Sequence, residues 1–289
     1  MEYLKVREAA RRLNVSPSTL RAWEHRFGFP RPDRSPGGHR LYRHADIAAL
    51  RDALEQGLSI SSAISRVRQG DMYDAPSLVG PLCAFDGDRA GRVAEGALAV
   101  RSLERAVEEV LLPALAEVGE RHGADSVEWA FAASWTGEWL RWARRLATQG
   151  PRSTRLLIAD ATAHELDADA IQLHALQLFC ARSGAQLLTV PVRSTRGLTA
   201  AVELFRPSAL VIAGGAASDD EVARFAYAAR AGTARPVALF RCRLRGRSAG
   251  VEQLDPAALA AHWQLLALLQ GEQPAAWQQR GELPPAVSG

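Results

Sequence analysis

One short stretch near the start of the chain constrains its fold more than any other. Val6 to Leu13 repeats apolar residues with the helical period, and Asn14-Val15 then interrupts the pattern. Ser16 is a good N-cap and Pro17 suits the first helical position, so we expect a second helix from there to about Phe27. Two short helices joined by so tight a turn predict a helix-turn-helix motif.

The residues that follow predict a small winged domain. The segment from Gly28 to Gly38 holds three prolines and three glycines, and with the next residues, His-Arg-Leu-Tyr, it is typical of a loop and a short hairpin, or wing. Helices expected at about 46–56 and 60–68 close the domain. Residues 1–72 carry 13 Lys and Arg against 8 Asp and Glu, whereas the remainder is slightly acidic. We therefore expect the first domain to meet a polyanion.

Two motifs in this region carry a family resemblance. The stretch SPSTLRAWEHRFG begins at Ser16, and GGHRLY begins at Gly37. Over residues 3–70 the chain resembles the MerR family of winged-helix regulators, and the WEHRFG and GGHRLY forms are similar to its CarH/LitR-type subgroup. The resemblance implies double-stranded DNA as a partner, read as a near-palindromic operator by a homodimer or higher oligomer, with RNA polymerase as a further partner.

The expected DNA contacts follow from the geometry of such motifs. A recognition helix puts its first residues into the major groove, where arginine pairs with guanine or grips phosphate. A wing offers its side chains to the DNA backbone. Trp23 is expected to pack between helix and wing, and the plain alternative for the charged residues is a solvated face. The expected DNA-binding residues are Ser18, Thr19, Arg21, Arg26, His39, Arg40 and Tyr42.

The remainder of the chain predicts two further structural classes. Residues 82–150 hold good helix formers with apolar steps at helical spacing, which predicts a helical bundle. From 151 to 270 short apolar runs alternate with helical segments, an order that predicts a doubly wound parallel sheet. The fold class is therefore multidomain, α and α/β: a winged helix-turn-helix over 1–72, a bundle, a doubly wound sheet domain and a flexible tail at 271–289. A bundle followed by such a sheet domain resembles the cobalamin-binding module of the same subgroup and of cobalamin-dependent methyltransferases.

The family resemblance also suggests a cobalt ligand. In the subgroup, a histidine in the loop after the first strand ligates cobalt within a Glu-x-His-x-x-Gly pattern. His164 matches that histidine, while Thr162 and Asp167 replace the flanking Glu and Gly. Other features are missing, since Ala132 and Ala133 stand where the family has Glu-His. The alternative is that His164 only caps the following helix.

Two more features are candidate ligand contacts. Trp135, Trp139 and Trp142 share one helix face, which can form a wall facing the sheet domain and hold a flat tetrapyrrole, or simply be bundle core or a dimer interface. Gly214 and Gly215 follow a buried strand and either admit a ligand or form an ordinary turn. Because several supporting groups are absent, tight adenosylcobalamin binding is not expected, and another tetrapyrrole, weaker cobalamin binding or no ligand stay open.

Several function classes are excluded or disfavoured. The sequence has no GxSxG, HExxH or Walker motif, so no enzyme is expected; the alternative is a cobalamin-dependent carrier or methyltransferase-like protein. Three widely spaced cysteines exclude a disulfide framework, and no apolar run is long enough for a membrane span. The expectation is a cytoplasmic transcriptional regulator whose second half senses a tetrapyrrole-class molecule, with light as one candidate signal, or mediates oligomerisation.

Overall fold

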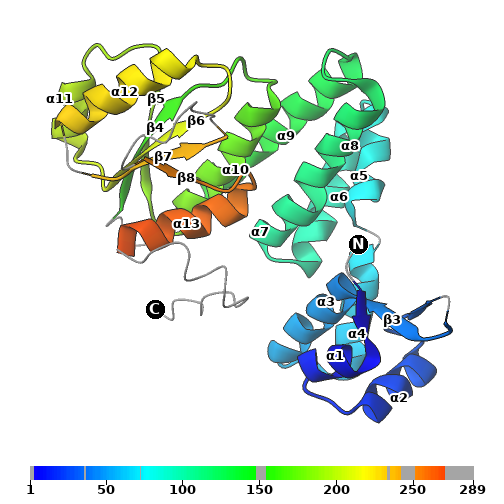
Figure 1. Ribbon diagram of the computed structural model, residues 1–289. Coiled ribbons are helices and arrows are strands. Elements are labelled where there is room, and N and C mark those ends of the chain that lie inside the picture. The colour runs from blue at the N-terminus through cyan, green and yellow to red at the C-terminus, as the bar shows by residue number, and fades with distance from the viewer. Residues whose placement is uncertain are drawn as a thin grey trace. The chain divides into compact units, whose positions relative to one another are not determined.

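The computed structural model describes residues 3–35, 37–71, 73–147, 154–232, 235–241 and 251–270 (Figure 1). The chain divides into two compact units: Met1–Gly80 with Asp88–Val110, and Pro81–Gly87 with Leu111–Gly289. The domain limits expected at 1–72, 82–150 and 151–270 stay predictions. The tail expected at 271–289 lies outside the described residues. In the described part of the chain, no helix has the length and hydropathy that a membrane span needs.

The first unit opens with the predicted helix-turn-helix. Helix α1 (Val6–Arg12) and helix α2 (Pro17–Phe27) are joined by a turn in which Asn14 has a left-handed φ of 54°. Ser16 caps α2, because its Oγ accepts a hydrogen bond from the backbone N–H of Thr19 at 3.0 Å. The helix ends at Gly28, whose φ of 62° suits glycine. The cap and the first helical residue are those that the sequence predicts.

The predicted wing is also present. Strands β1 (Tyr3–Lys5), β2 (Asp33–Arg34) and β3 (Arg40–Arg43) form an antiparallel sheet in the order β1-β3-β2. Helices α3 (His44–Glu55) and α4 (Ile60–Asp71) follow. One hydrophobic core joins these elements, and its most buried members include Leu4, Leu20, Tyr42, Ile47 and Leu50.

The middle of the chain is helical, as predicted. It contains helices α5 (Ala75–Cys83), α6 (Gly87–Val100) and α7 (Leu103–Ala106), a π-helical turn (Val107–Leu111), α8 (Leu112–His122) and α9 (Val127–Leu146). These helices contribute to both units. Within the second unit, α8 packs on α9 so closely that a Cβ at Gly119 would lie 2.9 Å from the Trp129 indole.

The second unit contains the predicted parallel sheet. Its strands are β4 (Arg155–Asp160), β5 (Gln186–Pro191), β6 (Ala209–Ala213), β7 (Val237–Phe240) and β8 (Val251–Gln253), ordered β5-β4-β6-β7-β8 and all parallel. Helices α11 (Leu198–Phe205) and α12 (Asp219–Gly232) cover one face, and α10 (Ala168–Arg182) and α13 (Ala258–Gln270) cover the other (Figure 1).

This strand order fixes where a ligand crevice is expected. The chain leaves β4 for β5 on one side and then crosses to β6 on the other side. The topological switch point therefore lies between β4 and β6. In doubly wound sheets, ligands bind outside the carboxyl ends of the strands at such a point. The loop that follows β4 carries His164, and the loop that follows β6 begins with Gly214.

Candidate functional site

The expected DNA contacts of α2 gather at its first turns. Ser18 and Arg21 are exposed, and Thr19 is half-buried. The Oγ of Ser16 lies 2.7 Å from the Ser18 Oγ and 2.8 Å from the Thr19 Oγ1. The Arg21 Nε donates to the Pro17 carbonyl oxygen at 3.1 Å, which lays the guanidinium along the helix start. Hydroxyls, a cation and the positive helix end thus share one exposed surface.

The wing is held against α2 by one carboxylate. The Arg40 Nε donates to both oxygens of Glu24, each at 3.1 Å, and the Tyr42 hydroxyl donates to Oε2 at 3.0 Å. Burial, with a smaller contribution from Glu24, raises the pKa of Tyr42 to about 12. Glu24 was not among the expected site residues, although it lies in the WEHRFG motif.

The expectation for Tyr42 therefore needs correction. Its side chain is fully buried and its hydroxyl is committed to Glu24, so it does not present a group to DNA. Arg40 differs, because 40% of its side chain stays exposed beside the carboxylate that holds it. The structure makes Tyr42 a core residue that fixes the wing.

The remaining expected DNA contacts are at the surface. Arg26 is exposed, and its guanidinium carbon lies 5.2 Å from the ring centroid of Phe27. His39 is exposed in the hairpin, where its backbone N–H donates to the Ser35 Oγ at 3.1 Å. Trp23 packs, half-buried, on the core of the domain. The DNA contacts of these exposed residues stay predictions.

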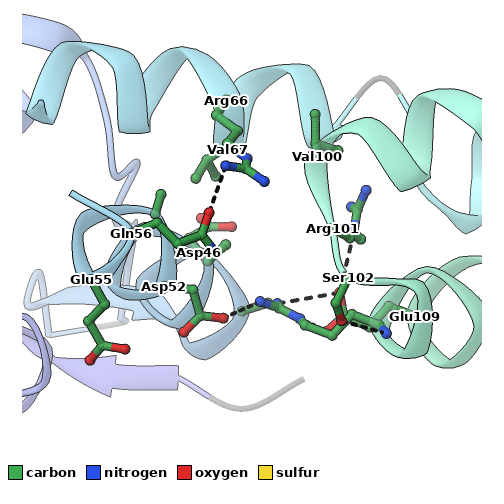
Figure 2. A pocket seen from close by; sticks show the side chains of 14 residues that line it. Asp46, Asp52, Glu55, Gln56, Arg66, Val67, Val100, Arg101, Ser102 and Glu109 are labelled. Atoms are coloured by element: carbon green, nitrogen blue, oxygen red, sulfur yellow. Dashed lines mark hydrogen bonds and ion pairs between the residues drawn. The ribbon is translucent and has the colours of Figure 1, made fainter. Parts of the chain in front are cut away.

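A pocket within the first unit lies between the helix-turn-helix domain and the segment that contains α6 and α7 (Figure 2). Arg105 forms an ion pair with Asp52 of α3, and its Nε lies 2.7 Å from Glu109 Oε1. The Arg101 Nε lies 3.3 Å from Glu109 Oε2. Across the pocket, the Arg66 Nη1 donates to the Gln56 Oε1 at 2.8 Å. Ion pairs thus tie α3 to residues that follow α6, a contact 53 residues apart in sequence that no local pattern signals.

The loop after β4 presents His164 to solvent. The Nδ1 of His164 accepts a hydrogen bond from the backbone N–H of Leu166 at 3.2 Å. Asp167 caps α10, because its Oδ1 accepts from the Asp169 N–H at 3.1 Å, and its Oδ2 accepts from the Ala163 N–H at 3.0 Å. The helix-capping alternative considered for His164 is therefore wrong, since Asp167 performs that role.

The loop after β6 packs directly on the loop after β4. Gly214 has a φ of 112°, and a Cβ there would lie 2.6 Å from the Thr162 backbone nitrogen. The N–H of Gly215 donates to the Asp169 Oδ2 at 2.9 Å, and the Nε of Arg241 donates to the other oxygen of Asp169. The crevice expected at the switch point is therefore bridged by the chain's own side chains.

The tryptophans of α9 do not form a wall that faces the sheet domain. The face of α9 toward α10 carries Gly137, where a Cβ would lie 3.1 Å from Ile171 Cδ1. It also carries Arg141, whose Nη1 lies 3.1 Å from His174 Nε2. At 3.6 residues per turn, the opposite side of the helix carries Trp135, Trp139 and Trp142.

A different tryptophan lies near His164. The Nε1 of Trp129 donates to the carbonyl oxygen of Leu166 at 3.0 Å, which ties α9 to the His164 loop. Trp135 instead lies against Gly87, and 52% of Trp142 is exposed. Trp129 was not among the expected ligand contacts. Any ligand role of Trp135, Trp139 and Trp142 stays a prediction without support from this arrangement.

These residues do not fit a cobalamin held through His164. A metal on the Nε2 of His164 would need the ring proton on Nδ1 and would break the hydrogen bond that Nδ1 accepts from the Leu166 N–H. The Asp169–Arg241 pair bridges α10 to the residue that follows β7, and the Trp129 indole ties α9 to the His164 loop. Among the described residues, no group of three or more His, Cys, Asp or Glu side chains could hold a metal ion.

Comparison with known families identifies two domains in the chain. Residues 4–68 match the MerR HTH family regulatory protein, and residues 78–131 match the B12 binding domain. The second match covers helices of the middle region, and neither match extends into the parallel sheet. The match to the first domain agrees with the motif-based resemblance.

Two named relatives share this region. The HTH-type transcriptional repressor CarA of Myxococcus xanthus is 38% identical over 133 residues, 41% of this chain and 45% of CarA. The HTH-type transcriptional repressor CarH of the same organism is 31% identical over 140 residues, 40% of this chain and 47% of CarH. The chain thus spans less than half the length of these relatives.

A solved structure was also found. The methanol:cobalamin methyltransferase complex MtaBC of Methanosarcina barkeri covers 71% of this chain and 83% of its own, with 11% identity and a TM-score of 0.34. A score this low carries no argument about the chain's activity.

Proposed function

We propose, from the premise that this chain joins a MerR HTH domain to a B12 binding domain, that it is a DNA-binding transcriptional regulator and not an enzyme. One observation carries the proposal. Glu24 fixes the wing to α2 while the first turns of α2, with Ser18 and Arg21, stay exposed. A domain so arranged can insert α2 into a major groove and lay the wing on the DNA backbone.

DNA duplexes selected by the full-length protein from a random-sequence pool provide the test. We expect a near-palindromic consensus, because a two-fold oligomer reads a two-fold site. Arg21→Ala should weaken binding to the selected duplex by about 1–3 kcal/mol and relax its sequence preference. Arg196→Ala, which removes an exposed charge in the second unit, serves as the control and should bind like the wild type. No enriched sequence, or equal binding by the Arg21 variant, would contradict the proposal.

Arg40 should act differently from Arg21. A wing arginine that grips phosphate supports binding to all sequences alike. Arg40→Ala should therefore weaken binding to selected and unselected duplexes equally and lower the salt dependence by about one ion. Binding titrations at several salt concentrations measure both effects. A loss confined to the selected duplex would instead make Arg40 a base-reading residue.

For the second half, we propose a sensor or assembly module that does not hold adenosylcobalamin tightly. The support is that Asp169 bridges Gly215 and Arg241 at the switch point, and that Ala132 and Ala133 stand where the subgroup has Glu-His. The same features disfavour a cobalamin carrier or methyltransferase-like protein. Protein mixed with adenosylcobalamin in the dark and passed through gel filtration should leave the column without the cofactor spectrum. Stoichiometric cobalamin retained by the wild type and lost by His164→Ala would overturn this proposal.

A further inference from the structure

A hollow at the His164 loop is lined by Arg141, which forms no ion pair with a carboxylate within the described part of the chain. It has a volume of about 590 Å³ and lies at the carboxyl ends of β4 and β5, with residues of α9 and α10 in its lining. That size is within the range of small-molecule sites. Its apolar lining includes Leu173, Val190 and Val192. Its polar lining includes Arg141, His174 and Thr189, together with the carboxylates Asp160 and Glu165.

Neutral groups hold Arg141 of the hollow and the neighbouring Arg144, whereas Arg193 at the rim pairs with Glu221. The Arg141 Nη1 donates to His174 Nε2 at 3.1 Å, and the Arg144 Nη1 donates to the Gln177 Oε1 at 2.5 Å. The Gln177 amide nitrogen in turn donates to the Thr189 hydroxyl at 3.2 Å. Within the described part of the chain, neither guanidinium forms an ion pair with a carboxylate. Arg141 is thereby held in place while its remaining N–H groups are free for another acceptor.

The electrostatics agree with this geometry. Burial lowers the pKa of His174, and the nearby Arg141 lowers it further, so the imidazole is a neutral acceptor. Burial, followed by Arg145 and Arg141, lowers the pKa of Arg144. Two carboxylates, Asp160 and Glu165, also line the hollow, and Asp160 accepts hydrogen bonds from the Thr162 N–H and hydroxyl at 2.9 and 2.7 Å. Neither carboxylate forms an ion pair with Arg141, so the guanidinium is held by a neutral partner within the described part of the chain.

We infer that this hollow binds a small oxyanion, with the Arg141 guanidinium as its main contact. A guanidinium offers two parallel N–H groups to a carboxylate or phosphate, and an anion in the hollow would give Arg141 the ion pair that it lacks within the described part of the chain. The apolar lining accommodates a small body behind the anionic group. The inference names a ligand class for the proposed regulator and to that extent rests on the proposed function.

Two probes test the site in the full-length protein. Inorganic phosphate and benzoate are titrated by calorimetry against chloride at constant ionic strength. We expect at least one of them to bind the wild type, and Arg141→Gln to lower its affinity at least tenfold. Arg145→Gln removes an exposed charge from the same helix and should bind like the wild type. The probe that binds identifies the oxyanion as phosphate or carboxylate.

Two further measurements keep the outcome unambiguous. Arg141→Lys keeps the charge without the planar fork, so it should fold like the wild type and bind the probe more weakly. Failure of both probes to bind the wild type, or equal affinity in the wild type and Arg141→Gln, would overturn the inference. DNA binding of the same preparations is measured separately. Intact DNA binding without anion binding refutes the site alone, whereas lost DNA binding with intact anion binding refutes the proposed function alone.

Discussion

Two carboxylates in this molecule, Glu24 and Asp169, each join separate segments of the chain, but in two different settings. Glu24 joins Arg40 and Tyr42 of the wing to α2 and leaves the first turns of α2 exposed. Asp169 joins Gly215 and Arg241 to the start of α10 and thereby bridges the loop after β6 and the residue that follows β7. One contact braces a surface that stays exposed, whereas the other joins segments at the carboxyl ends of the parallel strands. A carboxylate that joins two segments therefore does not by itself show whether the surface beside it is open to a partner.

The largest effect on the free energy of unfolding is expected at Gly214, where the loop after β6 contacts the backbone of the loop after β4. Gly214→Ala would put a Cβ 2.6 Å from the Thr162 nitrogen, at a φ of 112° that side chains rarely adopt. We expect the free energy of unfolding to fall by about 3 kcal/mol. Gly197→Ala also has a positive φ, 76°, but open space around the added atom, and should lose only about 1 kcal/mol. Urea unfolding of both variants measures the difference, and equal losses would mean that the two loops are not in contact.

A smaller effect is expected from the side chains that bridge the crevice. Asp169→Ala leaves the Gly215 N–H and the Arg241 guanidinium without their shared acceptor. The expected loss is about 2 kcal/mol, because the carboxylate is mostly buried and both partners remain. Glu203→Ala, an exposed carboxylate in α11, is the matched control and should change stability by less than about 0.5 kcal/mol. If the free energy of unfolding falls no further in Asp169→Ala than in this control, the bridge from Asp169 to Gly215 and Arg241 does not stabilise the fold.

The two regions also differ in how much of them the sequence predicts. The Ser16 cap, the Pro17 start and the wing hairpin are local signals, so the first domain follows from short-range patterns. The order of strands and helices likewise predicts the parallel sheet. The contacts that decide the sites are not local, since Asp169 meets Arg241 72 residues away. No spacing rule reveals such a partner.

Helix faces illustrate the same limit. Trp135, Trp139 and Trp142 share a face by periodicity alone, and the sequence does not say which neighbour that face meets. The face of α9 that meets α10 is the one with Gly137, because a glycine without a side chain lets α10 approach closely there, opposite the three tryptophans. A glycine in the middle of an otherwise strong helix was the available signal for that close approach.

The wing contact should give a moderate effect with a distinctive pH dependence. Tyr42→Phe removes the hydroxyl that donates to Glu24 and should cost about 1 kcal/mol. The native pKa of about 12 lies above the ordinary value of 10, so the unfolded chain loses this proton first as pH rises. Stability should therefore fall between pH 10 and 12 in the wild type, and Tyr42→Phe should remove that part of the fall. Tyr227→Phe is the control, since 80% of Tyr227 is exposed. A slope between pH 10 and 12 that persists unchanged in Tyr42→Phe would contradict the assignment.

The smallest effect is expected at the ion pair between Asp52 and Arg105, and it bears on how the first unit is held together. Both side chains keep about a third of their surface exposed, so water screens the pair and limits its contribution. A double-mutant cycle with Asp52→Asn and Arg105→Gln should give a coupling of about 0.5 kcal/mol. Because Arg105 also contacts Glu109 at 2.7 Å, only the cycle separates the two interactions. We expect this pair to contribute the least of the three contacts compared, because the Asp52 side chain is 35% exposed, against 21% for Glu24 and 20% for Asp169. A coupling above about 2 kcal/mol would contradict that order and would mean that water screens the pair less than its exposure indicates.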